Sequence, residues 1–274
     1  MKTTTESILP LGINNRETLS PLAVIAVGVA LAGSSVTLAN PQTILNNSGT
    51  PAPGLVEAFL EPFPELEVTG AGTTLTRHPD GGFRLSAING PDTVKISGKA
   101  SRIVVDDING EPVVDLSDLV TPQVEFAGTI NGSPRISVTC DSGSVEFRQS
   151  INGSPRITIN CPAGSVGFIE AVGGGAHLTI NAAHGNVRFH APVNGGPKVI
   201  LIARQVEFSA GLDGGASVDL TLNSGGSLGY SRLDGGSSLT LRKSRADDPH
   251  PTVHGDPSGS GRLIEAPPVA ADPE

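Results

Sequence analysis

The chain has 274 residues, a net charge of −9, 35 glycines, only 3% aromatic residues and no tryptophan. With so few large rings, it must bury aliphatic side chains in many thin layers rather than around a conventional aromatic core. The negative charge argues against general nucleic-acid binding, because that function needs a basic surface to replace the counterions of the phosphates.

Residues 1–39 have the pattern of an export segment. An uncharged apolar run extends from Leu22 to Ala32, and small and polar residues follow as far as Ala39. This run is shorter than the roughly 20 residues that span a membrane, and it suits the apolar core of a signal peptide. The weakly basic segment before it leaves three alternatives open: a cleaved signal peptide, an uncleaved membrane anchor or a buried helix. We expect an exported protein, secreted or membrane-anchored at the cell envelope.

Residues 40–65 are rich in Pro, Asn and Gly, and we expect a linker or a cap there. Residues 66–244 are built from repeats. A short phrase recurs every 19–22 residues. It consists of an aliphatic residue, then Asn or Asp in all copies but one, and then Gly. Its copies start at Ile88, Ile108, Ile130, Ile151, Val172, Val193, Leu212 and Leu233. A period this regular indicates a solenoid, in which residues 66–86 resemble a degenerate first coil.

Each repeat carries the signals of one β-helix coil. The Asx-Gly pair favours a tight turn, because both residues tolerate positive φ. Two short runs with alternating apolar residues follow, such as Ile136–Val138 and Val145–Phe147, and this alternation is typical of half-buried strands. No helical spacing appears between Ile88 and Leu241. The sequence therefore predicts an all-β, single-stranded parallel β-helix solenoid of about eight coils with about 21 residues each.

Stacked coils place equivalent residues about 4.8 Å apart, so each repeat position becomes a column along the rod. One column is predicted to be an internal aromatic stack of Phe126, Phe147, Phe168, Phe189, Phe208 and Tyr230. Another is predicted to be a ladder of turn side chains, formed by Asn89, Asn109, Asn131, Asn152, Asn194, Asp213 and Asp234. Columns of like residues stabilise stacked strands.

The only two cysteines, Cys140 and Cys161, share a column in adjacent coils. This spacing brings their Cα atoms within the range that a disulfide tolerates. A buried pair of free thiols is the alternative. Two cysteines without clustered histidines do not make a zinc site, and we expect neither a metal nor a cofactor.

A basic column is the candidate ligand-binding feature, and it contains Arg135, Arg156, His177 and Lys198. Stacked like charges repel, and one hypothesis is that a linear anionic polymer, such as an anionic glycan, lies along the rod and neutralises them. The alternative is that these side chains extend into solvent at little cost or pair with nearby acids. A column containing Glu125, Glu146 and Glu207 could supply those acids. Two polar columns are interpreted as solvent-facing strand positions. One contains Ser137, Thr158 and Thr179, and the other contains Thr139, Asn160 and Asn181.

Catalysis has little support in the sequence. A carbohydrate-active β-helix would gather carboxylates at one place, and the candidates for this are Asp106, Asp107, Asp115 and Asp118. These residues also suit turns. No nucleophile or metal-binding motif is present, so no catalytic residue is assigned.

After Ser244 the chain is polar and rich in proline, and residues 245–274 are expected to form a disordered tail.

The repeated unit, an aliphatic residue followed by Asx-Gly and an alternating strand, resembles the repetitive parallel β-helix proteins of bacterial surfaces. Adhesin heads of autotransporter type and polymer-forming bactofilins are similar to residues 66–244 in this respect. This resemblance concerns the fold alone. The regular coils, without a disrupted active cleft, indicate an exported, non-enzymatic structural or adhesion rod that contacts envelope components. A glycan-binding or carbohydrate-active β-helix and a filament-forming scaffold, self-associating through its coil ends, stay open as alternatives.

Overall fold

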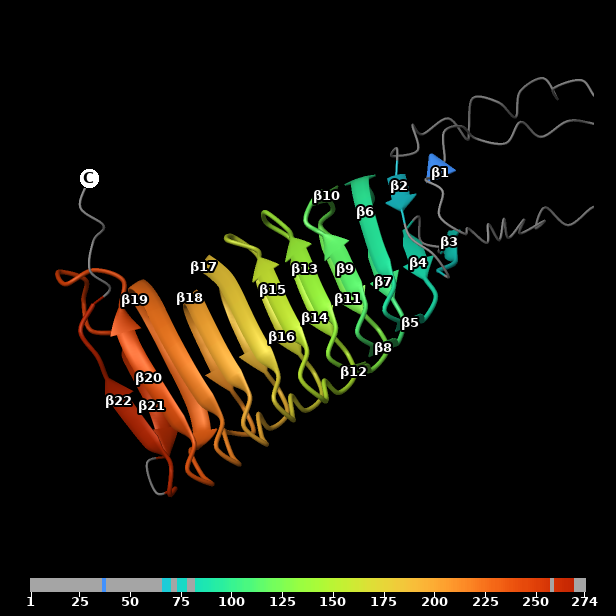
Figure 1. Cartoon of the computed structure of the whole chain (residues 1–274). Helices are drawn as coiled ribbons and strands as arrows, with labels where there is room; N and C mark the ends of the chain where they lie inside the picture. Colours follow the sequence, from blue (N-terminus) through green and yellow to red (C-terminus); the bar gives the residue numbers. More distant parts are fainter. Residues whose placement is uncertain (1–35, 38–65, 70–72, 78–81, 257–258, 269–274) are drawn as a thin grey trace, which may run out of the picture.

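A computed structural model describes residues 36–37, 66–69, 73–77, 82–256 and 259–268. These residues form an all-β, mostly parallel solenoid of about nine turns with coils of about 21 residues. Figure 1 shows the coils stacked side by side into a rod, with the sequence running from one end to the other. The predicted fold class and coil length are confirmed.

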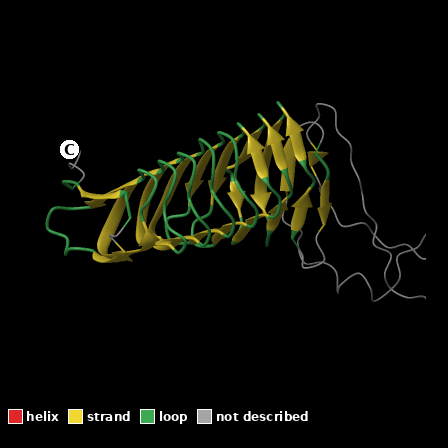
Figure 2. Ribbon diagram, turned by 90° about the horizontal axis from the view of Figure 1, so that it is seen from below, coloured by secondary structure: helices red, strands yellow, loops and turns green. Residues whose placement is uncertain are grey.

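Each coil has two main strands, and the strands of successive coils form two parallel sheets. The first sheet, which follows the Asx-Gly turns, contains β6 (Thr93–Lys99), β9 (Val113–Leu116), β13 (Arg135–Thr139), β15 (Arg156–Asn160), β20 (Ser238–Lys243) and β22 (Arg262–Glu265). The second sheet contains β4 (Phe83–Leu85), β7 (Ile103–Val105), β11 (Gln123–Phe126), β14 (Ser144–Phe147), β16 (Ser165–Phe168) and β21 (Thr252–Asp256). Figure 2 shows the strands in two layers along the rod, joined by loops.

Three long strands bend at a corner and contribute to both sheets: β17 (His177–Phe189), β18 (Lys198–Phe208) and β19 (Ser217–Arg232). The short strand β10 (Leu119–Val120) pairs in parallel with the end of β6.

The Asx-Gly turns form the third side of the coil. Here β5 (Ile88–Gly90), β8 (Ile108–Gly110) and β12 (Ile130–Gly132) pair in parallel, and single parallel bridges continue this side as far as Leu233. Gly153 has a φ of 85°, and a Cβ built on it would lie 2.3 Å from the carbonyl oxygen of Gly132. Glycine is therefore required both for the turn conformation and for the close approach of the coils.

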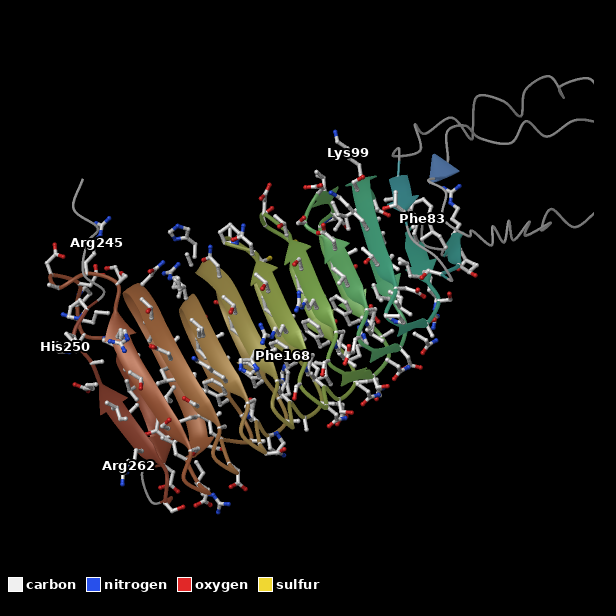
Figure 3. The ribbon with its side chains drawn as sticks, viewed as in Figure 1. Phe83, Lys99, Phe168, Arg245, His250 and Arg262 are labelled. Atoms are coloured by element: carbon white, nitrogen blue, oxygen red, sulfur yellow. The ribbon has the colours of Figure 1, made fainter. Side chains whose placement is uncertain are left out.

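The core lies between the two sheets and consists of columns. Five phenylalanines, Phe126, Phe147, Phe168, Phe189 and Phe208, stack with ring centroids 4.5–4.8 Å apart and interplanar angles of 2–14°. Tyr230 pairs with Phe208 in register, and Gly255 occupies the next position of the column. Phe168 lies near the middle of the rod in Figure 3.

The Asx column behaves differently along its length. Asn109 donates to the Oδ1 of Asn89 at 3.1 Å, and Asn131 donates in the same way to Asn109 at 3.1 Å. Asn152 continues this ladder with a longer contact of 3.5 Å. In the later coils the column contains the aspartates Asp213 and Asp234, which accept hydrogen bonds from Gly214 and Ser260 instead. A carboxylate cannot donate to its neighbour, so the amide ladder forms only where asparagines follow one another.

The N-terminal end departs from the predicted degenerate coil. β2 (Leu66–Thr69) pairs with β6, and β3 (Leu75–Arg77) pairs with β4, both in antiparallel fashion. β1 (Val36–Thr37) adds to β2 in the same sense. The first edge of each sheet is therefore covered by an antiparallel strand, since residues 66–77 do not repeat the coil pattern.

The prediction of a disordered tail from residue 245 is wrong for β21 and β22. Leu263 of β22 lies in register with Leu239, and Val253 of β21 lies in register with Leu228, so both strands extend the parallel sheets by one coil. The polar, proline-rich composition concealed these two aliphatic positions, and the edge of the preceding coil supplies their backbone partners. Figure 3 shows Arg245, His250 and Arg262 at this end of the rod and Phe83 and Lys99 near the other.

The predicted export segment, residues 1–39, and the predicted linker, residues 40–65, lie outside the described residues apart from β1. Among the residues that are described, no helix is long and apolar enough to span a membrane.

Candidate binding face

The basic column lies on the outer face of the first sheet. Arg135 begins β13, and Arg156, His177 and Lys198 begin the corresponding strands of the next three coils. The pairing places each of these residues directly beside the next, and all four are exposed. The side chains point outward because the neighbouring aliphatic residues of each strand, such as Ile136 and Ile157, fill the core.

Two polar columns run beside the basic one on the same face. The nearer column contains Ser137, Thr158 and Thr179, and the next contains Thr139, Asn160 and Asn181, each in register from coil to coil. Asn181 donates to the Oδ1 of Asn160 at 2.9 Å. Positive groups, hydroxyls and amides therefore repeat together at the strand spacing of about 4.8 Å.

A recess of about 390 Å³ adjoins the first half of the basic column. It is lined by Ser133, Arg135, Ser154, Arg156, Glu111 and Val113. Four of these residues come from the two copies of the phrase Asn-Gly-Ser-Pro-Arg, so the recess is built from equivalent positions of adjacent coils. In the following two coils glycines, Gly175 and Gly196, take the place of the serines.

Among the described residues, no carboxylate forms an ion pair with Arg135, Arg156, His177 or Lys198. His177 contacts the carbonyl oxygen of Gly175 through Nδ1 at 2.9 Å. The alternative that Glu125, Glu146 and Glu207 neutralise this column is wrong, because those acids lie on the second sheet.

The glutamates of the second sheet pair with arginines of their own face. Glu125 is buried, with 7% of its side chain exposed, and it binds both Arg102 and Arg148, with 2.7 Å between Arg148 Nε and Glu125 Oε1. Arg148 also binds Glu146 at 3.2 Å. Arg188 and Glu207 form a more exposed pair at 3.4 Å.

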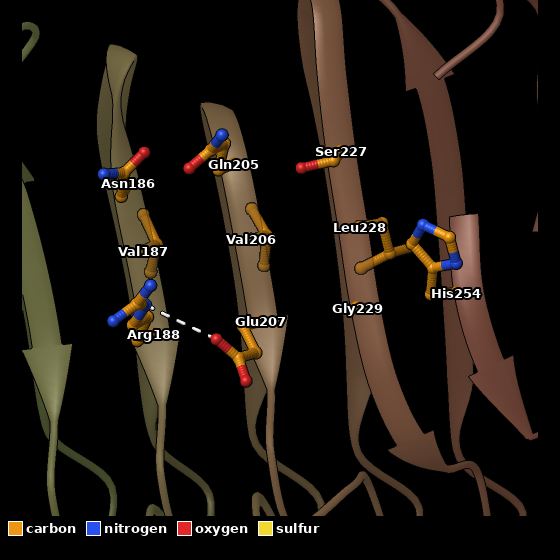
Figure 4. Close-up of a pocket in the computed structure, with 10 residues that line it drawn as sticks. All are labelled: Asn186, Val187, Arg188, Gln205, Val206, Glu207, Ser227, Leu228, Gly229 and His254. Carbon is orange, nitrogen blue, oxygen red and sulfur yellow. Dashed lines mark ion pairs between the residues drawn. The ribbon is translucent and has the colours of Figure 1, made fainter. Parts of the chain in front are cut away.

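A shallow recess of about 210 Å³ lies over the second sheet near its C-terminal end. Figure 4 shows Arg188 and Glu207 joined by their ion pair, and His254 two strands beyond Glu207. The hollow exists because Gly229, between Glu207 and His254 in register, has no side chain. Its charged groups already neutralise each other, so it makes a weaker case for an anion or cation site than the basic column does.

The candidate catalytic acids hold structural positions. Asp106 pairs with Arg84 at 2.7 Å, and Asp118 pairs with Lys95 at 2.6 Å. Asp107 accepts hydrogen bonds from the backbone and hydroxyl of Thr129. Ser117 donates to Asp115 in the same way and lowers the pKa of that carboxyl. Within the described residues no three His, Cys, Asp or Glu side chains gather into a metal-binding group.

Cys140 and Cys161 follow β13 and β15, and both are buried and unbonded to each other in this structure. The Cys140 thiol donates to the carbonyl oxygen of Thr121 at 3.4 Å, and the Cys161 thiol donates to that of Gly143 at 3.8 Å. When Cys140 ionises, a hydrogen bond from the Cys161 thiol holds the pKa of Cys140 below its ordinary value. The same hydrogen bond and burial raise the pKa of Cys161 well above its ordinary value. The column placement agrees with the sequence, and of the two alternatives this structure contains the free thiols.

Sequence reasoning missed the recess at Ser133 and Ser154. The available signal was that the two identical phrases keep serine where the next two coils have glycine. It also missed the burial of Glu125, because an alternating strand pattern assigns that position to solvent. The arginines that enclose it come from neighbouring coils and are not evident from its own repeat.

Comparisons of the chain with models of protein families, with curated proteins and with solved structures find no match.

Proposed function

We propose that the chain is an exported, non-enzymatic rod that serves as a structural or adhesion module of the cell envelope. The observation that carries this proposal is the continuity of the columns along the solenoid. The phenylalanine stack passes through five successive coils, and the same coils keep their outward columns in register. Such a stack resists bending and presents a repeating surface, which are the properties that a spacer or an adhesion surface needs.

Export rests on the apolar run between Leu22 and Ala32, whose length suits a signal-peptide core. A rod outside the cell meets polymers and surfaces rather than small metabolites. The repeating outward columns suit such extended partners better than a single compact ligand.

The filament-forming alternative is less favoured by the two ends. β2 and β3 cover the N-terminal edges with antiparallel strands, which a second copy would have to displace. At the other end Glu265 of β22 occupies the register position of the buried Leu241. A charge placed at an inward position of the last coil is a common device against edge-to-edge association.

Cell fractionation tests the proposal. Bacterial cells would produce the full chain and a variant that lacks residues 1–39. We expect the full chain in the envelope or medium and the shortened chain in the cytosol. A full chain that stays in the cytosol would refute export, and turnover of any polysaccharide by the purified protein would refute the non-enzymatic role.

A further inference from the structure

We infer that the basic column and its two flanking polar columns form a binding face for a linear acidic polysaccharide that carries carboxylates, a polyuronate. This inference rests on the proposed role as an exported rod, because it names the chemistry of the partner that the rod would contact. The face comprises Arg135, Arg156, His177 and Lys198 with the neighbouring columns that begin at Ser137 and Thr139.

The first step of the argument is the contrast in charge pairing. Elsewhere arginines and lysines bind acids of adjacent coils: Arg84 does so on the second sheet. Lys95 and Arg242 do so on the first sheet, in coils before and after those of the basic column. The basic column places its four members one coil apart, and none of them has such a partner among the described residues. In a protein with a net charge of −9, acids are more abundant than bases, so this column is not unpaired for want of acids. An external chain of negative charges would neutralise it.

The second step concerns the shape of the partner. The four positions repeat at about 4.8 Å, so the column extends over about 14 Å in a straight line. A linear polymer can contact successive members, whereas a small anion would contact one or two. The recess beside Arg135 and Arg156 admits a substituent at one end of this line. Glu111 also lines the recess, and because its carboxylate repels anions it limits the part of the recess that an anionic group can occupy.

The third step distinguishes a glycan from a nucleic acid. Hydroxyl and amide groups lie beside the basic column, and they can form hydrogen bonds with the hydroxyl groups of sugar rings. The hydroxyls are those of Ser137, Thr158 and Thr179, and the amides are those of Asn160 and Asn181. Single-stranded nucleic acids also need exposed aromatic rings on which bases stack. Within the described residues the phenylalanines and Tyr230 are buried.

The fourth step concerns the acidic group. Arginine presents a planar fork that matches a carboxylate with two parallel hydrogen bonds. Arg135 and Arg156 offer two such forks in register, and Ser133 and Ser154 stand beside them in the recess. Carboxylates spaced along a sugar chain are therefore the anions that this face fits best.

Calorimetric titration of the purified full chain with polygalacturonate tests the inference. Fully methyl-esterified polygalacturonate supplies the same sugar chain without the charge, and dextran sulfate and an oligothymidine supply other anions. We expect binding of polygalacturonate that weakens with salt, weaker binding of dextran sulfate, and no binding of the ester or the oligothymidine. Absence of polygalacturonate binding, or binding of dextran sulfate or the oligothymidine that is equally tight, would overturn the inference.

The double variant Arg135→Gln/Arg156→Gln should weaken polygalacturonate binding by about tenfold. Its matched control, Arg188→Gln/Arg204→Gln, changes the net charge equally but lies outside the face, and it should stay within about twofold of the parent. Lys198→Gln provides a second, independent variant, expected to weaken binding by about threefold. Thermal unfolding establishes that each variant is folded, and unchanged binding in a folded variant of the face counts against the inference.

The two proposals fail in different ways. A chain retained in the cytosol that still binds polygalacturonate through Arg135 and Arg156 would refute export and leave the binding face intact. Binding followed by release of unsaturated or shortened uronates would refute the non-enzymatic role alone. An exported chain without affinity for polygalacturonate would refute only the binding face.

Discussion

Each sheet of the solenoid carries a column in which like charges adjoin, but among the described residues only the column on the second sheet has counter-charges. On the second sheet, Glu125 and Glu146 adjoin in register, but Arg148 binds both carboxylates and Arg102 also binds Glu125. On the first sheet, Arg135 lies beside Arg156, and the signs are the same. Stacking brings like charges equally close in both cases, but arginines compensate this repulsion on the second sheet, whereas on the first sheet no carboxylate among the described residues compensates it. The repulsion within the basic column lowers the stability of the fold, and a negatively charged partner outside the fold would explain why the column exists.

The largest test of this comparison removes the buried acid of the second sheet. Glu125→Gln leaves Arg102 and Arg148 near each other without their shared carboxylate, and it should lower the free energy of unfolding by about 3 kcal/mol. Urea denaturation measures this change. Glu207→Gln, in the exposed pair with Arg188, is the control and should cost less than about 0.5 kcal/mol. Equal losses in the two variants would mean that the burial of Glu125 has no energetic consequence.

A matched pair of arginine substitutions, one on each sheet, should change the stability in opposite directions. Arg148→Gln removes contacts to two glutamates and should lower stability by about 1 kcal/mol. Arg156→Gln relieves repulsion between neighbouring bases and should raise stability by about 0.3 kcal/mol. Urea denaturation at low ionic strength measures both changes. A stability loss in Arg156→Gln as large as in Arg148→Gln would show that the basic column has a structural counter-charge.

His177→Glu converts the basic column into one with alternating sign. The new carboxylate would lie between Arg156 and Lys198 in register, and it should raise stability by about 0.5 kcal/mol at low salt. The gain should shrink in 1 M salt, which screens exposed charges. His177→Gln separates the added charge from the loss of the imidazole, and a gain of the same size in that variant would contradict the electrostatic explanation.

The smallest effect concerns Asp115, which lies in register with Ser137 where the polar column next to the basic one begins. Hydrogen bonds from Ser117 lower the pKa of Asp115 in the folded state, so they stabilise the protein above the unfolded pKa of about 4. This contribution is lost as the pH falls through the folded pKa. Ser117→Ala should therefore cost a few tenths of a kcal/mol at pH 7 and nothing near pH 2. A cost that persists at pH 2 would assign the effect to the hydroxyl itself.

The repeat determined the fold, the register of the columns and the identity of the residues within each column. Those features depend on the period alone, because parallel coils of equal length place each residue beside its own copy. Phe126 and Phe147 stack, and Arg135 and Arg156 adjoin, for this one reason. The sequence therefore also indicated which four bases form the candidate face.

Only the tertiary structure decided which columns share a face and how the rod ends. The glutamates and the basic column lie on different sheets, because the corner between the two strands of a coil sets their relative direction, and no repeat period encodes that corner. The terminal strands lack copies on which to stack, so periodicity does not reveal them. β2 and β3 pair in antiparallel fashion, and β22 extends the rod from a segment whose composition suggested disorder. The end strands depend instead on the open backbone edges that the neighbouring coils present.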